Sequence, residues 1–166
     1  CPPRKSQRTS RQTRGAVMRL LFGYGNPGRG DDALGPLLIE RISQYELAQT
    51  QYLTDMQLLI EHTVDLAEFD QILFIDADTA CMEPYEFSTV TAQKDNSYTS
   101  HALTPAALLF VYQQVFHHRA PTAFLLRIRG YQFGLGHSLS KQAENNLESA
   151  VRKIRQWCND SLNSIP

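Results

Sequence analysis

Residues 19–35 read RLLFGYGNPGRGDDALG and contain the signals of the first structural unit. Its first six residues are mostly apolar, which is typical of a buried strand, and the glycines and proline that follow end the strand in a turn. From about Ala33 to Ile42, large aliphatic side chains recur every four residues, which predicts a helix. A strand, a glycine-rich turn and a helix in this order are the opening unit of an α/β protein.

The rest of the chain continues the alternation of strand-like and helix-like patterns. We expect further strands at Gln51–Asp55, Gln71–Ile75, Tyr85–Thr91 and Ala123–Arg129. We expect helices at Leu58–Phe69, from Thr104-Pro105 to Phe116, and from Leu139 to Cys158. The buried face of the second of these helices is expected to hold Leu108, Val111, Tyr112, Val115 and Phe116. This order predicts one α/β domain over residues 18–166. The fold is a three-layer α/β/α sandwich whose mixed, mostly parallel sheet has about five strands.

Composition and charge exclude several classes of protein. The chain has 166 residues, 42% hydrophobic and 20% charged, and no apolar run approaches the roughly 18 residues that span a bilayer. Residues 1–17 hold five basic and no acidic residues, and we interpret them as a disordered or non-native leader, with a transit peptide or a nucleic-acid-binding arm as the alternatives. Without them, 11 basic residues face 17 acidic ones, a net charge of about −6, which argues against nucleic-acid binding. The three cysteines form no CxxC pair, which favours the cytoplasm.

The glycine-rich turn does not read as a nucleotide-binding loop. Gly23, Gly25 and Gly28 have the GxGxxG spacing, but Asp31 and Asp32 follow where a helix N-terminus would receive phosphates. Two carboxylates there would repel a pyrophosphate, and no GK[ST] follows. We expect one of the two aspartates to cap the helix, a role that does not need both.

Three segments that follow predicted strands carry candidate chemistry. Asp32 follows the first strand, Asp76 follows residues 71–75, and His101 follows residues 85–91. Ligands of open α/β sheets bind outside the carboxyl ends of the strands, so we expect these three side chains on one rim. Two carboxylates and an imidazole suit a divalent transition metal or acid–base catalysis on an amide.

Other catalytic arrangements are missing from the sequence. It holds neither a GxSxG elbow nor an HExxH helix, and no cysteine follows a strand in a nucleophile turn. His62, His117, His118 and His137 lack metal-ligand spacing, and we expect the first three at the surface.

Four motifs in a fixed order resemble the hydrogenase maturation endopeptidases over nearly all of residues 18–158. They are GYGNPGRGDDALG at 23–35, FIDAD at 74–78, SHALTP at 100–105 and RIRGYQFGLGHSLS at 127–140. The resemblance implies a phosphorylase/hydrolase-like α/β/α fold. It also implies a cytoplasmic endopeptidase that removes a C-terminal extension from the large-subunit precursor of a nickel–iron hydrogenase after nickel insertion. RIRGYQF resembles the members that serve bidirectional, NAD-coupled hydrogenases.

The resemblance also implies roles for individual residues. Asp32, Asp76 and His101 would recognise the nickel of the substrate and carry out an aspartic-type or metal-assisted hydrolysis, without an organic cofactor. We expect a monomer whose partner is the large-subunit precursor, with no nucleic-acid or membrane partner. Many relatives have glutamate where this chain has Asp32, so either the loop sits closer here or Asp31 shares the role. His137 departs from the relatives' pattern and has no assigned function.

Two other functions are compatible with parts of the sequence. Residues 22–28, FGYGNPG, resemble the opening of peptidyl-tRNA hydrolases, but that family needs a histidine and an asparagine soon after the turn, and no histidine precedes His62. The second alternative is a non-catalytic checkpoint protein that binds the nickel-loaded subunit without cutting it.

Overall fold

The computed structural model describes residues 16–95 and 103–163. Five strands form one sheet in the order β2-β1-β3-β5-β4. Their bounds are β1 Arg19–Tyr24, β2 Thr50–Asp55, β3 Gln71–Asp78, β4 Tyr85–Val90 and β5 Thr122–Arg129. All neighbours are parallel except β4, which runs antiparallel to β5. The predicted mixed, mostly parallel sheet is confirmed.

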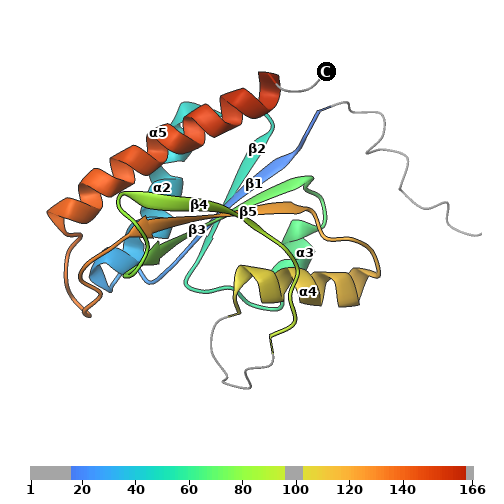
Figure 1. Cartoon of the computed structure of the whole chain (residues 1–166), viewed down its shortest axis with the longest axis horizontal. Coiled ribbons are helices and arrows are strands. Elements are labelled where there is room, and N and C mark those ends of the chain that lie inside the picture. Colours follow the sequence, from blue (N-terminus) through green and yellow to red (C-terminus); the bar gives the residue numbers. More distant parts are fainter. Residues whose placement is uncertain (1–15, 96–102, 164–166) are drawn as a thin grey trace, which may run out of the picture.

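Helices cover both faces of the sheet, as Figure 1 shows. Helices α2 (Leu34–Ile42) and α5 (Lys141–Asn163) lie on one face, and α3 (His62–Leu66) and α4 (Pro105–Phe116) lie on the other. Two short 3-10 helices, η1 (Gly30–Ala33) and η2 (Ser43–Tyr45), flank α2. In the part of the chain that the structure describes, no helix is long and apolar enough to cross a membrane.

Successive residues of the strands contribute side chains to two separate hydrophobic cores, one on each face of the sheet. Under α2 and α5 the core includes Leu21, Leu73 and Leu126, whereas under α3 and α4 it includes Phe22 and Phe74. Each large aliphatic or aromatic side chain that is fully buried contributes about 1.5–3 kcal/mol to folding, so the two cores hold the sheet rigid. A rigid sheet fixes the relative positions of the side chains at its edge.

The predicted start of α4 at Thr104-Pro105 is confirmed, whereas the predicted burial of Val115 in its last turn is wrong. The Thr104 hydroxyl accepts a hydrogen bond from the Ala107 N–H at 3.1 Å, and Pro105 is the first helical residue. Val115, expected on the buried face, is 52% exposed. Phe116, expected on the same face, is partly buried and packs on Tyr112, with 4.6 Å between ring centroids.

Other boundaries also differ from the prediction. The helix expected over Leu58–Phe69 is confined to His62–Leu66, because the Leu59 N–H donates to the His62 ring and holds residues 56–61 as a loop. Strand β3 continues to Asp78, so Asp76 belongs to the strand and does not follow it. Residues 1–15 of the predicted leader lie outside the described residues.

Candidate functional site

A row of polar side chains crosses the sheet where the parallel strands end. The register pairs Tyr24 with Asp55 on β2, and it pairs Arg127 with both Asp76 on β3 and Glu86 on β4. On the four parallel strands, the residues two positions earlier are apolar and belong to the core under α3 and α4. On this face of the sheet, the side chains therefore change from apolar to polar within two residues near the end of each of these strands. This change places a polar surface at the carboxyl edge of the sheet.

The loop after β1 folds back so that Asp32 lies against the end of the strand. An oxygen of the Asp32 carboxylate, Oδ2, accepts a hydrogen bond from the Asn26 N–H at 2.8 Å. A Cβ at Gly25 would lie 2.0 Å from the Asp32 carbonyl oxygen, and the backbone φ of Gly25 is +150°, so only glycine fits. The expected helix cap is wrong, because neither aspartate makes a side-chain cap hydrogen bond to η1 or α2.

Asp31 has a structural role that its sequence position does not reveal. It is fully buried and accepts hydrogen bonds from the N–H groups of Tyr131, Gln132 and Ser140 and from the Ser140 hydroxyl, at 2.7–3.0 Å. Burial raises the pKa of Asp31, but these hydrogen bonds outweigh that effect and hold the pKa below its usual value. Because its oxygens are occupied, Asp32 is the carboxylate of this pair that is left for the site.

The same two loops are joined by backbone hydrogen bonds. The Gly30 N–H donates to the His137 carbonyl at 3.1 Å, the Asp31 N–H to the Gln132 carbonyl at 2.8 Å, and the Gly136 N–H to the Gly28 carbonyl at 2.9 Å. Gly30 has a φ of +57°, and a Cβ there would lie 2.4 Å from the Gln132 carbonyl oxygen. The backbone of His137 therefore helps to fix the loop after β1, while its side chain is exposed.

Asp76 is the acid whose titration is most perturbed. Its Oδ1 accepts the Ala77 N–H at 2.8 Å, and the Tyr24 hydroxyl donates to its carboxylate. Burial and the nearby charge of Asp32 raise the pKa of Asp76 to about 7, although the two hydrogen bonds favour its charged form. A carboxyl group that titrates near neutral pH can both accept and release a proton during catalysis.

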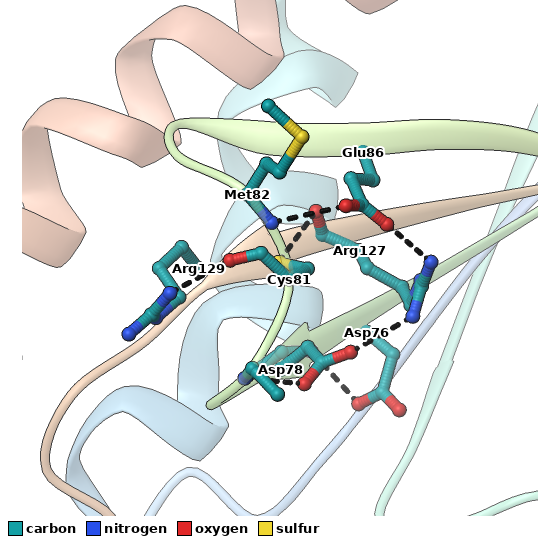
Figure 2. A network of polar contacts seen from close by, with 9 residues as sticks. Asp76, Asp78, Cys81, Met82, Glu86, Arg127 and Arg129 are labelled. Carbon is teal, nitrogen blue, oxygen red and sulfur yellow. Dashed lines mark hydrogen bonds and ion pairs between the residues drawn. The ribbon is translucent and has the colours of Figure 1, made fainter.

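Arg127, the register partner of Asp76, is engaged by two other acids. Figure 2 shows its guanidinium between Asp78 and Glu86; Nη1 lies 3.1 Å from Asp78 Oδ2, and Nη2 contacts the Glu86 carboxylate. Glu86 also accepts the Met82 N–H at 3.1 Å. Within residues 16–95 and 103–163, no ion pair involves Asp76. The guanidinium of Arg127 therefore pairs with Asp78 and Glu86, and not with Asp76.

His62 closes the other end of the polar row, and the expectation that it lies at the surface is wrong. It is 6% exposed, and its ring packs edge-on against Phe22 with 4.8 Å between centroids. Its Nδ1 accepts the Leu59 N–H at 2.8 Å, so Nε2 carries the proton and donates to Asp55 Oδ2 at 3.0 Å. Both ring nitrogens of His62 are occupied, so this histidine is not free to act as the base that a peptidyl-tRNA hydrolase requires. His117 and His118 are exposed, as expected.

His101, the third predicted site residue, lies outside the described residues. The expectation that the strand before His101 ends at this rim is wrong, because β4 is antiparallel and Val90 therefore lies at the edge opposite Asp76. The chain has turned back by Gln93, whose N–H donates to the Ala106 carbonyl at 3.0 Å near the start of α4. Among the residues described, no three His, Cys, Asp or Glu side chains lie close enough to hold a metal ion by themselves.

Solved structures with the same fold include several hydrogenase maturation endopeptidases. The protease HycI from Thermococcus kodakarensis KOD1 has a TM-score of 0.69 and 20% identity over 88% of this chain and 95% of that chain. The endopeptidase HybD from E. coli has a TM-score of 0.69 and 17% identity over 87% and 94%. The hydrogenase 2 maturation peptidase from Thaumarchaeota archaeon SCGC_AB-539-E09 has a TM-score of 0.61 and 17% identity over 86% and 98%.

The chain has the fold of the hydrogenase maturation endopeptidases. No protein-family model matches it, and neither does any curated protein. The likeness thus concerns the backbone architecture.

Proposed function

We propose that this protein is an endopeptidase that removes the C-terminal extension of a nickel–iron hydrogenase large-subunit precursor after nickel insertion. The observation that supports this most is the meeting of Asp32 and Asp76 at the ends of β1 and β3, where the charge of one raises the pKa of the other. Two acids held together in this way favour a divalent cation or a shared proton. The shared fold with hydrogenase maturation endopeptidases supports the same function.

The substrate's nickel would bind to Asp32, Asp76 and His101. Two carboxylate oxygens and one imidazole nitrogen suit a transition metal of borderline softness. Since the described residues supply two carboxylates and no third ligand, free metal should bind weakly until the substrate adds its own ligands. The site would then respond to nickel in a loaded precursor and ignore an empty one.

Asp76 is the residue best suited to move protons in the hydrolysis. In its charged form it takes a proton from the attacking water, whose oxygen adds to the scissile carbonyl carbon. The carbon–nitrogen bond then breaks, and the proton passes to the leaving amine. The Tyr24 hydroxyl orients the Asp76 carboxylate, and the substrate's nickel can polarise the carbonyl as a Lewis acid. The reaction is therefore aspartic-type or metal-assisted, with no organic cofactor.

The client and setting belong to the same proposal. Residues 127–133 favour a bidirectional, NAD-coupled hydrogenase as the source of the precursor. We propose that the enzyme acts as a monomer in the cytoplasm, on a protein substrate and not on nucleic acid or a membrane.

The test is to mix the purified protein with nickel-loaded and nickel-free precursor and to follow the precursor mass. Loss of a C-terminal peptide from the nickel-loaded sample alone is the expected result. A stable complex without cleavage would identify a non-cutting checkpoint protein. Absence of both binding and cleavage with a matched precursor would overturn the proposed function.

A further inference from the structure

Strand β2 presents an open edge at the border of the sheet. Among the residues that the structure describes, its only strand neighbour is β1. The Arg19 N–H donates to the Gln49 carbonyl at 2.9 Å, and the Gly25 N–H donates to the Asp55 carbonyl at 3.1 Å, so odd-numbered residues of this segment face β1. Successive residues of a parallel strand direct their backbone N–H and C=O groups to opposite sides. The groups of the even-numbered residues therefore point outward, away from β1. They belong to Thr50, Tyr52 and Thr54, and within the described ranges no hydrogen bond satisfies them.

The residues of β2 lack the sequence features that normally protect an edge strand. The sequence of β2 is TQYLTD, with no lysine, proline or glycine and no charge before its last residue. An unprotected row of backbone donors and acceptors is a template for another strand, and threonine and tyrosine favour strand pairing. Peptide-binding proteins use such edges to hold an extended segment, with main-chain hydrogen bonds supplying affinity.

A groove connects this edge to the candidate site. It has a volume of about 200 Å³ and is lined by Gly25, Pro27, Pro36, Thr54, Asp55 and Met56. Met56, which is 57% exposed, follows the last residue of β2, and Gly25 backs directly onto Asp32. A segment lying on the β2 edge would therefore run into an apolar groove beside the first acid of the site.

We propose that an extended segment of the polypeptide substrate adds to the open edge of β2 as a sixth strand and places an apolar side chain in the groove beside Met56. The inference rests on the proposed function and names how its substrate is held. Backbone pairing on β2 holds the segment extended, and the groove sets which residue approaches Asp32.

The opposite border strand, β4, provides a matched comparison. The Arg129 N–H donates to the Pro84 carbonyl at 3.1 Å, so Thr89 is one of the β4 residues whose backbone groups face outward. The end of β4 at the carboxyl edge holds the Glu86–Arg127 ion pair, whereas the end of β2 holds the groove. An outward-facing residue on either strand can become proline without losing a hydrogen bond inside the sheet.

The test compares Thr54→Pro with Thr89→Pro, each first shown to melt as one cooperative unit. Affinity for the nickel-loaded precursor and the kcat and KM of cleavage are measured for both. We expect Thr54→Pro to raise the Kd and KM about tenfold with little change in kcat, since one interfacial backbone hydrogen bond is lost. Thr89→Pro should leave both unchanged. Wild-type values for Thr54→Pro, or equal losses in both variants, would overturn the proposal.

Hydrogen exchange provides a second readout in case Thr54→Pro does not fold. In an Asp76→Asn variant that binds precursor without cutting it, the amides of Thr50, Tyr52 and Thr54 should exchange at least about tenfold more slowly in the complex. Unchanged exchange in a proven complex would overturn β2 pairing and leave the proposed function standing. Protection without precursor that grows with protein concentration would identify a second copy of the chain as the occupant and would also overturn it. A wild-type protein that neither binds nor cuts refutes the proposed function and this inference together.

Discussion

The Tyr24 hydroxyl donates a hydrogen bond to Asp76 and so joins the last residue of β1 to the acid near the end of β3. Burial and the charge of Asp76 raise the pKa of Tyr24 well above its usual value, so the phenol stays protonated and remains a donor. This bond stabilises the charged form of Asp76, which is the form that can take a proton from water.

Tyr24→Phe should therefore shift the pH profile of cleavage. Loss of the donor raises the pKa of Asp76, so a smaller fraction is ionised at pH 6. We expect a several-fold lower rate near pH 6 and little change near pH 8, with folding weakened by about 1 kcal/mol. Cleavage rates from pH 5.5 to 8.5 provide the measurement. A profile that coincides with the wild type would remove Tyr24 from the mechanism.

Asp76→Asn should abolish cleavage and stabilise the fold. The pKa of about 7 in the folded state exceeds the unfolded value of 3.8, so the native protein retains a proton that the unfolded chain has lost. The free energy of unfolding therefore falls as the pH rises from about 4 to 7, and the full cost is present above pH 7. We expect the variant to gain about 2–4 kcal/mol at pH 8 and nothing near pH 3.

Urea unfolding of Asp76→Asn at pH 3, 5 and 8 checks this prediction, with Asp31→Asn as the matched control in the neighbouring loop. A variant that still cuts the precursor, or that is less stable than the wild type at pH 8, contradicts it.

Asp31→Asn should weaken the fold. The pKa of Asp31 is lowered in the native state, so its contribution to stability is present above the unfolded pKa and disappears as the pH falls through the folded pKa. At pH 7 we expect a loss of about 2–4 kcal/mol, because a buried charged acceptor is removed from four donors. Thermal melting should show a difference in Tm between the wild type and Asp31→Asn at pH 7, and this difference should be smaller in acid. Equal melting temperatures at pH 7 would contradict the structural role.

Arg127→Gln should leave Asp78 and Glu86 without their cation. Their charges then act on Asp76, so we expect slower cleavage at neutral pH and a loss of about 1 kcal/mol in stability, since the pairs are partly exposed. Adding Asp78→Asn and Glu86→Gln removes the surplus charge and should restore much of the rate. Failure of this combined variant to recover, with folding intact, would mean that the guanidinium acts on the substrate itself.

Local sequence patterns were sufficient for the strands, for the parallel order of most of the sheet and for the approach of Asp32 to Asp76. Period and turn residues are encoded within a few positions, and parallel strands bring their carboxyl ends to one edge. The antiparallel direction of β4 is not encoded locally, so the sequence pattern did not show at which edge of the sheet the strand before His101 ends.

The interaction partners of Asp31, Tyr24 and Arg127 also could not be predicted from the sequence. Each meets its partner across strand register or between distant loops, and no local spacing reports such a meeting. Tyr24 could have been found from the period of two that it shares with Phe22, whose side chain lies on the same face.

The buried Asp31 makes the loop after β1 and the loop after β5 one mechanical unit. When loops are exchanged between relatives, these two loops must therefore be transferred together. A graft that transfers residues 25–33 without 130–140 would leave an ionised carboxylate facing foreign backbone, whereas a graft of both loops carries its own donors. Diversification of client choice in such a scaffold should therefore proceed by paired changes in these two segments.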